Sequence, residues 1–251
     1  MLPPISVVIP AFNEAVRIGD TLAVTIDYLE KESASSEVIV INDGSTDLTG
    51  EVIRKVSAVP SSVTIRSLEN FPNRGKGAAV RTGLLNATTP IGVFFDADLS
   101  TPIDEVPKIV EPIARNEADI AFGSRALDRK LIGNRQPWRR EQGGRVFNLV
   151  VRKTTGLPFW DTQCGFKAFR MEACRPIIEA AKIIGFGFDV ELLLLGQRAG
   201  LRLREIPVRW NHHEGSKIHF VNDSVRMLRE VLSLRANNSD IRKRPNGASA
   251  G

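Results

Sequence analysis

The chain has 251 residues, of which 42% are hydrophobic and 25% are charged. This composition excludes a disordered, collagen-like or disulfide-stapled protein and provides enough apolar material for a sizeable core. The net charge of +5 is unevenly divided, because residues 1–124 carry 10 Lys and Arg against 17 Asp and Glu, whereas residues 125–251 carry 24 against 12. A basic half predicts an anionic partner such as a phosphate, a nucleic acid or a lipid headgroup.

No stretch of the sequence approaches the ~18 apolar residues that a membrane-spanning helix needs, and no apolar signal region follows Met1. We therefore expect the chain as given not to be integral to a membrane. Its two cysteines, Cys164 and Cys174, are too few for a disulfide framework or a cysteine-based zinc site. This usage fits a reducing compartment, with both thiols buried as small apolar side chains.

In the first half, short β-branched runs alternate with segments of helical length. The runs predict strands at 5–9, 38–41, 63–68, 91–95 and 120–122. The segments between them predict helices at 14–32, 47–56, 75–86 and 104–116, the last of them kinked or interrupted by Pro112. This alternation predicts an α/β fold, with a mostly parallel central sheet and helices on both faces.

The second half is less regular. Residues 125–153 hold nine Lys and Arg against two acids and predict a loop that leads into a basic helix at 141–154. Further helices are expected at 175–182, 191–199 and 223–234, and a strand at 204–210. We expect a single domain over residues 1–238, followed by a polar, disordered tail at 239–251.

Polar motifs follow the first two predicted strands. Residues 10–14 (Pro-Ala-Phe-Asn-Glu) come after the first strand, and residues 42–47 (Asn-Asp-Gly-Ser-Thr-Asp) come after the second. Ligands of parallel sheets bind beyond the carboxyl ends of the strands, where the Asp43 carboxylate would accept hydrogen bonds from a base or a ribose. The alternative interpretation is structural, with Asp43-Gly44 as a turn and Ser45 or Asp47 as a helix cap.

The strongest local signal is the pair Asp96 and Asp98, directly after a hydrophobic strand. Two carboxylates this close repel each other, and a divalent cation relieves that repulsion. Mg²⁺ or Mn²⁺ held by one or two carboxylates and by diphosphate oxygens is usual for nucleotide substrates. The weaker alternative is that Asp98 or Ser100 caps the next helix.

A second motif, Asn-Arg-Gly-Lys-Gly at 73–77, places Lys76 between two glycines at a predicted helix start. The helix end favours an anion, and glycine permits close approach of the backbone, although the motif is not a Walker A loop. By itself the pattern is a weak signal for a phosphate loop and is more typical of a solvated lysine in a turn.

Taken together, the motifs at 10–14, 43–47 and 96–98 resemble the nucleotide-sugar domain of the family 2 inverting glycosyltransferases. The motifs at 73–77, 96–102, 123–125, 161–167 and 186–191 are similar to those of its dolichyl-phosphate β-glucosyltransferase branch and the prokaryotic polyprenyl-phosphate relatives. The resemblance implies a GT-A (Rossmann-like) domain, with a nucleotide-sugar half at 1–124 and an acceptor half at 125–238.

The resemblance also implies roles for individual residues. It places Asp96 and Asp98 at the metal, Ser216 and Lys217 in a loop near the donor diphosphate, and a set of eight residues around the donor nucleotide: Pro10, Phe12, Glu14, Asp43, Lys76, Asp96, Ala97 and Asp98. It also implies that three arginines of the basic segment 125–153 face the acceptor phosphate, namely Arg125, Arg139 and Arg140.

The implied reaction transfers glucose from UDP-glucose to a polyprenyl or dolichyl phosphate with inversion. Asp98, Asp161 and Asp189 are the catalytic candidates, and Asp161 or Asp189 would contact sugar hydroxyls or orient an arginine. For Glu191 we favour a structural role in a cap or an ion pair. The expected location is cytoplasmic and peripheral, with the basic half on an anionic membrane surface.

Two alternatives remain open at this point. With a soluble saccharide or phosphorylated acceptor, a hydroxyl nucleophile would need a general base, for which Asp189 is the candidate. A nucleic-acid-binding module is disfavoured, because residues 125–153 offer only Trp138 and Phe147 for stacking on bases. Zinc at His212 and His213 is also disfavoured, since adjacent residues of an extended segment point to opposite sides.

Overall fold

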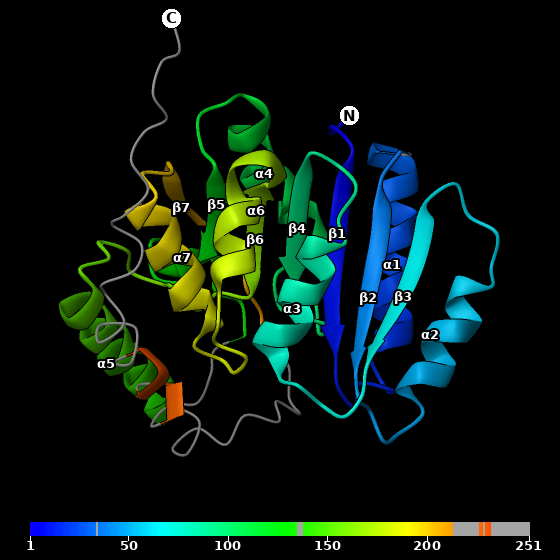
Figure 1. Cartoon of the computed structure of the whole chain (residues 1–251), viewed down its shortest axis with the longest axis horizontal. Helices are drawn as coiled ribbons and strands as arrows, with labels where there is room; N and C mark the ends of the chain where they lie inside the picture. Colours follow the sequence, from blue (N-terminus) through cyan, green and yellow to red (C-terminus); the bar gives the residue numbers. More distant parts are fainter. Residues whose placement is uncertain (34, 135–137, 213–225, 228, 232–251) are drawn as a thin grey trace, which may run out of the picture.

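The computed structural model describes all residues except 34, 135–137, 213–225, 228 and 232–251, and it leaves the side chains of 138–141 undescribed. The described residues form one seven-stranded sheet of order β3-β2-β1-β4-β6-β5-β7 (Figure 1). Its strands are β1 (Ile5–Ala11), β2 (Glu37–Asp43), β3 (Thr64–Asn70), β4 (Ile91–Phe95), β5 (Ile120–Ser124), β6 (Phe166–Arg170) and β7 (Leu203–Pro207).

The inner strands are buried because both of their faces are covered. β2, β4 and β5 are buried along their whole length, as their nearly continuous apolar sequences predict. β3 is an edge strand whose residues are exposed or half-buried, apart from the buried Asn70. β1 pairs in parallel with β2 and β4, β2 with β3, and β5 with β7.

β6 is the one strand of the described sheet that the sequence analysis missed. It runs antiparallel between β4 and β5, and Lys167 is its second residue. A five-residue segment with two cations gives no strand signal, because its burial depends on charge partners from elsewhere in the chain. The predicted strand at 204–210 is shorter than expected and ends at Pro207, which has no N–H to donate to a ladder.

The helices lie on both faces of the sheet (Figure 1). One face carries α1 (Ile18–Glu32), α2 (Thr49–Ser57) and α4 (Val106–Ala114). The other carries α3 (Lys76–Leu85), α5 (Trp138–Thr155), α6 (Met171–Ala180) and α7 (Phe188–Arg198). Single 3-10 turns occupy Ile103–Glu105 and Arg129–Leu131. The predicted α/β architecture, a single mostly parallel sheet between helical layers, is confirmed.

Helix boundaries differ modestly from expectation. α4 runs through Pro112 and ends two residues later at Ala114, so the proline lies in the last turn and does not interrupt the helix. α5 begins at Trp138, earlier than expected. The predicted helix at 223–234 and the predicted tail at 239–251 fall largely or wholly outside the described residues.

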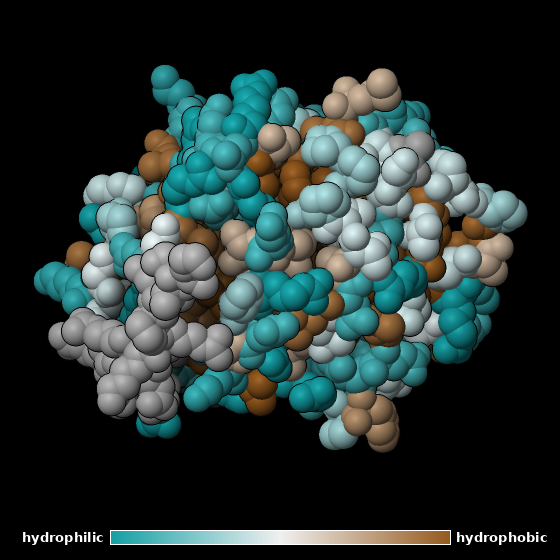
Figure 2. Space-filling view, turned by 45° about the horizontal axis from the view of Figure 1, so that its top comes forward, coloured by the Kyte–Doolittle hydropathy of each residue, from teal (hydrophilic) through white to brown (hydrophobic). Residues whose placement is uncertain are grey.

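The carboxyl ends of the parallel strands meet at one edge of the sheet, the lower edge in Figure 1. Figure 2 turns the opposite edge toward the viewer and shows apolar residues scattered among hydrophilic ones. Among the described residues, no helix is both long enough and apolar enough to span a membrane.

Candidate active site

The loops after β1 and β2 are joined by one asparagine. Asn13 lies in the left-handed region at φ 55°, and its Oδ1 accepts a hydrogen bond of 2.8 Å from the Thr46 amide. The Asn13 amide in turn donates to Ser45 Oγ at 2.9 Å. The two motifs that follow these strands therefore form one structural unit at the lower edge of the sheet.

Asp43 ends β2 and organises the loop that precedes α3. Its Oδ1 accepts from Asn70 Nδ2 at 2.8 Å and from the Arg74 amide at 3.1 Å, and its Oδ2 accepts from the Gly75 amide at 2.8 Å. Gly44 has a φ of +72°, and a Cβ there would lie 2.5 Å from the Asn73 nitrogen. The turn interpretation thus applies to Gly44, and any contact of Asp43 with a nucleotide would add to these three hydrogen bonds.

The start of α3 differs from the open phosphate cradle that its sequence suggested. The Gly77 amide donates to the Ile184 carbonyl at 2.9 Å. A Cβ on Gly75 would lie 2.4 Å from the same carbonyl oxygen, and a Cβ on Gly77 would lie 2.6 Å from that of Ile183. The two glycines therefore allow the 183–185 segment to pack against the helix start. The Gly77 amide is used by this segment and the Gly75 amide by Asp43, so neither is free for an anion.

Lys76 is a half-buried partner of Asp96 and is not a solvated turn residue. Its Nζ lies 2.5 Å from Asp96 Oδ1. Burial alone would lower the pKa of Lys76, but the charges of Asp96 and Asp189 outweigh burial and raise that pKa above its ordinary value. Lys76 is therefore a fixed positive charge beside the first carboxylate of the Asp-Ala-Asp motif.

The Asp-Ala-Asp turn is fixed by its neighbours. Thr21 of α1 donates its hydroxyl to the Ala97 carbonyl at 2.6 Å. Asp98 Oδ1 accepts from the Ser100 amide at 2.9 Å, which makes a local turn and does not cap the following helix. Gly165 lies against Asp96, since a Cβ on that glycine would lie 2.3 Å from Asp96 Oδ2. The two carboxylates thus lie at the end of β4 in a tightly packed turn.

These carboxylates fit a divalent metal of the magnesium type. Within the described part of the chain, no group of three or more His, Cys, Asp or Glu side chains gathers as a ready-made cage. Mg²⁺ and Mn²⁺ bound with a nucleotide do not need such a cage, because substrate phosphates and water complete the octahedron around one or two carboxylates. Asp98 is half-buried, and its hydrogen bond to the Ser100 amide uses Oδ1, so Oδ2 is the oxygen left for such a contact.

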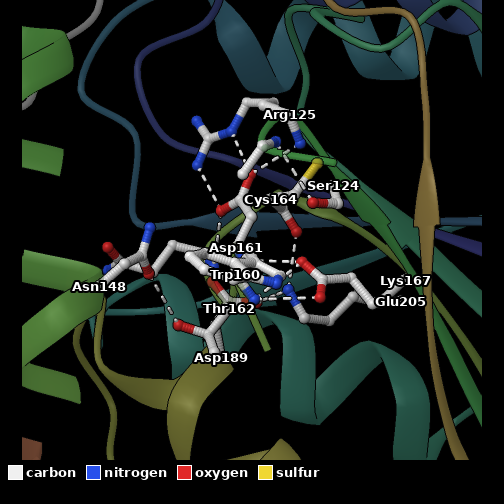
Figure 3. A network of polar contacts seen from close by, with 12 residues as sticks. Ser124, Arg125, Asn148, Trp160, Asp161, Thr162, Cys164, Lys167, Asp189 and Glu205 are labelled. Carbon is white, nitrogen blue, oxygen red and sulfur yellow. Dashed lines mark hydrogen bonds and ion pairs between the residues drawn. The ribbon is translucent and has the colours of Figure 1, made fainter. Parts of the chain in front are cut away.

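Arg125 and Asp161 form a bidentate ion pair (Figure 3). Asp161 lies in the same loop as Gly165, which packs against Asp96. Arg125 Nε donates to Asp161 Oδ2 at 2.6 Å, its Nη2 donates to Oδ1 at 2.8 Å, and its amide also donates to Oδ2 at 3.0 Å. Asp161 is only 2% exposed. Burial alone would raise the pKa of Asp161, but the Arg125 guanidinium lowers it below the ordinary value. The guanidinium also lies 5.6 Å from the Trp210 ring.

Glu205 of β7 supports this pair from behind, a role that the sequence analysis did not foresee. Its Oε1 accepts from the Asp161 amide at 2.8 Å and its Oε2 accepts from the Trp160 amide at 3.0 Å (Figure 3). The loop 161–165 is thereby fixed to the sheet.

A third ion pair lies deeper and involves Asp189 of α7. Its Oδ1 is 2.7 Å from the ammonium of Lys167, a residue that the sequence analysis did not single out. Burial raises the pKa of Asp189, and the charges of Lys167 and Lys76 oppose that rise. Glu191, also on α7, accepts from the amides of Lys182 and Ile183 at 2.9 and 2.7 Å, which is the structural arrangement that we favoured.

The remaining predicted residues are divided between the described and undescribed parts. Pro10 is the penultimate residue of β1 and is half-buried, Phe12 is 40% exposed, Ala97 is buried, and Glu14 pairs with Arg17 at 2.6 Å. The side chains of Arg139 and Arg140, and the whole of His213, Ser216 and Lys217, lie outside the described residues. Cys164 and Cys174 are buried free thiols, and burial raises the pKa of each to about 12.

Comparison with known proteins shows the family of the chain. The family model "Glycosyl transferase family 2" matches residues 6–178, a span that runs from the second residue of β1 past β6 and includes the Asp-Ala-Asp turn and the Arg125–Asp161 pair. The chain belongs to glycosyl transferase family 2. It is therefore a glycosyltransferase.

Curated members of the family are similar over most of the chain. A dolichyl-phosphate beta-glucosyltransferase of Dictyostelium discoideum is 33% identical over 92% of this glycosyltransferase and 73% of the relative. One of Homo sapiens is 33% identical over 92% and 74%, respectively.

Solved structures share the fold. The glucosyl-3-phosphoglycerate synthase of Mycobacterium tuberculosis, in complex with Mn²⁺, UDP and glucosyl-3-phosphoglycerate, matches with a TM-score of 0.67 at 22% identity. The match covers 92% of this glycosyltransferase and 77% of that chain. The expected GT-A fold is therefore confirmed.

Proposed function

We propose that this glycosyltransferase moves glucose from UDP-glucose to a polyprenyl or dolichyl phosphate, with inversion at the anomeric carbon. The observation that carries the proposal is the Arg125–Asp161 pair, which fixes a forked cation next to the Asp-Ala-Asp turn. A rigid guanidinium matches the oxygens of a phosphate monoester. The names of the relatives that share 33% identity support the same acceptor and the same sugar.

The donor side of the proposal uses the edge formed by β1, β2 and β4. UDP would lie along Pro10, Phe12, Glu14 and the Asp43 loop, with its diphosphate near Lys76 and near Ser216 and Lys217 of the undescribed segment. Asp96 and Asp98 would hold Mg²⁺ or Mn²⁺, which when bound would neutralise the departing diphosphate. Lys76 would supply a second positive charge. When the donor binds, its ammonium would leave the Asp96 carboxylate and pair with a phosphate oxygen.

On the acceptor side, the nucleophile is an oxygen of the lipid phosphate. It forms a bond to the anomeric carbon from the face opposite UDP while the bond from that carbon to the UDP oxygen breaks, and the electron pair leaves with UDP. A phosphate oxygen is already ionised near neutral pH and needs no general base. Arg125, with Arg139 and Arg140, would orient it, so that catalysis is mainly positioning and charge stabilisation.

The state of Asp189 favours a phosphate over a hydroxyl acceptor. A soluble sugar acceptor would require a carboxylate that accepts its proton, and Asp189 was the candidate. Its carboxylate is buried and forms an ion pair with Lys167 at 2.7 Å. Because this carboxylate is only 3% exposed and faces a buried cation, an incoming hydroxyl has little access to it, and the geometry supports the acceptor that needs no base.

The proposed location is a peripheral one at the cytoplasmic face of an anionic membrane. The outer side of α5 exposes Val146 and Leu149 at 61% and 51%, together with Lys153. Beyond the helix, Trp160 is 56% exposed and lies beneath the Arg152 guanidinium, 4.0 Å from ring centre to carbon. Aliphatic, aromatic and basic side chains on one face are typical of helices that lie in a lipid interface.

A screen of donors and acceptors tests the proposal. Purified protein with Mn²⁺ or Mg²⁺ is offered UDP-glucose, UDP-galactose, UDP-N-acetylglucosamine or GDP-mannose, each with a short-chain polyprenyl phosphate, 3-phosphoglycerate or a sugar alcohol. We expect product with UDP-glucose and the polyprenyl phosphate. Turnover of UDP-glucose with 3-phosphoglycerate alone would replace the lipid acceptor by a soluble phosphorylated one.

A further inference from the structure

Lys167 is a fully buried lysine in the middle of the sheet. Its exposed fraction is 0%, although lysine is rarely buried to this extent without charge partners. The ammonium donates to the Cys164 carbonyl at 2.7 Å and lies 2.7 Å from Asp189 Oδ1. Figure 3 shows it beneath the loop that carries Asp161.

The antiparallel register of β6 explains how a lysine reaches this place. Lys167 is paired with Phe94 on β4 and with Phe122 on β5. The centres of these two rings lie 5.6 and 5.8 Å from its Nζ. The rings of both neighbouring strands therefore cover the lysine stem and offer their faces to the ammonium. This enclosure fixes the position of the charge.

The ammonium joins two elements that carry site residues. Cys164 belongs to the loop 161–165, in which Asp161 holds Arg125 and Gly165 packs against Asp96. Asp189 belongs to the first turn of α7. One buried charge thus connects α7 to the loop that touches both the acceptor-side arginine and the metal-side carboxylate.

We propose that Lys167 is a positioning residue for glycosyl transfer, which sets the loop 161–165 relative to α7 and, through that loop, the placement of Arg125 and Asp96. The inference rests on the proposed function, because that proposal assigns Arg125 to the acceptor and Asp96 to the metal and nucleotide. Lys167 itself touches neither substrate in this arrangement. Its effect on the reaction is geometric.

The competing explanation is that Lys167 only stabilises the fold. Arg170 offers a control on the same strand, because it lies at the opposite end of β6 and pairs with Asp119 at 3.2 Å, away from the site. Lys167→Met keeps the stem and removes the ammonium, whereas Arg170→Met removes a half-buried cation from the same strand. Lys167→Arg keeps the charge but cannot keep the position of Nζ.

The variants are compared at a temperature well below the midpoint of unfolding of each. We expect Lys167→Met to lower kcat about 100-fold, the loss that a misplacement of ~1 Å causes, with Lys167→Arg between it and the unmodified protein. We expect Arg170→Met to lower stability with little change in kcat. If Lys167→Met and Arg170→Met both keep kcat per folded molecule, the positioning role is refuted.

A second variant and a binding measurement cover the cases in which Lys167→Met does not fold or no sugar is transferred. If Lys167→Met does not fold, full kcat in the folded Lys167→Arg variant overturns the proposal, and a reduced kcat supports it. If the unmodified protein transfers no sugar to any phosphate acceptor, the proposed function fails while calorimetric binding of UDP with Mn²⁺ still decides the inference. In that calorimetric experiment, weaker binding of UDP with Mn²⁺ by Lys167→Met than by Arg170→Met supports positioning through Gly165 and Asp96, and equal binding by the two variants refutes it.

Discussion

The Asp161 carboxylate holds the Arg125 guanidinium by two parallel hydrogen bonds of 2.6 and 2.8 Å and also accepts the Arg125 amide. The acid comes from the loop after α5 and the arginine from the end of β5, so the pair joins segments 36 residues apart. Because the acid is buried and the arginine is 29% exposed, the acid anchors a cation that still reaches the surface.

Asp161→Asn should weaken use of the acceptor more than binding of the donor. The amide keeps the shape of the side chain but loses one acceptor position and the negative charge, so Arg125 is no longer fixed in its bidentate geometry. We expect kcat/KM for the polyprenyl phosphate to fall roughly 10- to 100-fold. Steady-state kinetics with each substrate varied in turn checks this. A loss confined to KM for UDP-glucose would contradict it.

The stabilising effect of Asp161 should depend on pH. Its pKa in the folded protein lies below the unfolded value of about 3.9, so its contribution is fully present above that value and is lost as the pH falls through the folded pKa. Urea unfolding of the unmodified protein and of Asp161→Asn should therefore differ by about 1.5 to 3 kcal/mol at pH 7. The difference should shrink below about pH 4. A difference that grows on acidification would show the opposite sign.

Asp98→Asn should abolish metal-dependent transfer and leave the fold intact. Asp98 lies in a turn outside the core and makes only one local hydrogen bond with the described residues, to the Ser100 amide. An asparagine retains that acceptor but is a much weaker ligand for Mg²⁺ or Mn²⁺. We expect activity at least about 100-fold lower, with an unchanged circular dichroism spectrum and midpoint of unfolding. Full metal-dependent activity in the variant would remove Asp98 from the site.

Gly165→Ala should damage the metal and nucleotide site through Asp96. The added methyl group would lie 2.3 Å from Asp96 Oδ2, so the carboxylate or the loop must move. We expect weaker binding of UDP with Mn²⁺, by about tenfold, in calorimetry. The control is Gly144→Ala on α5, where a Cβ meets nothing within 4 Å and which should be neutral or slightly stabilising. Equal binding by both variants would show that Gly165 does not constrain Asp96.

Much of the fold was predictable because its local and global signals agree. The apolar runs of β1, β2 and β4 are long enough to require burial on both faces, and the helical segments between them leave few alternatives to a parallel sheet. β6 was not predicted because the burial of its Lys167 depends on contacts of the ammonium with Asp189 and the Cys164 carbonyl. A period-2 pattern of apolar residues does not reveal such contacts.

The sequence by itself determined which residues follow the strands and hence which chemistry gathers at one edge. The order of apolar runs and polar motifs decides that placement for Asp43, Asp96 and Asp98. Only the tertiary structure decided which cation pairs with which carboxylate around the site. Lys76 pairs with Asp96, Arg125 with Asp161 and Lys167 with Asp189. Strand order and side-chain burial set these pairs, because Coulomb energy depends on distance in space and on local polarity, and neither is written in the spacing along the chain.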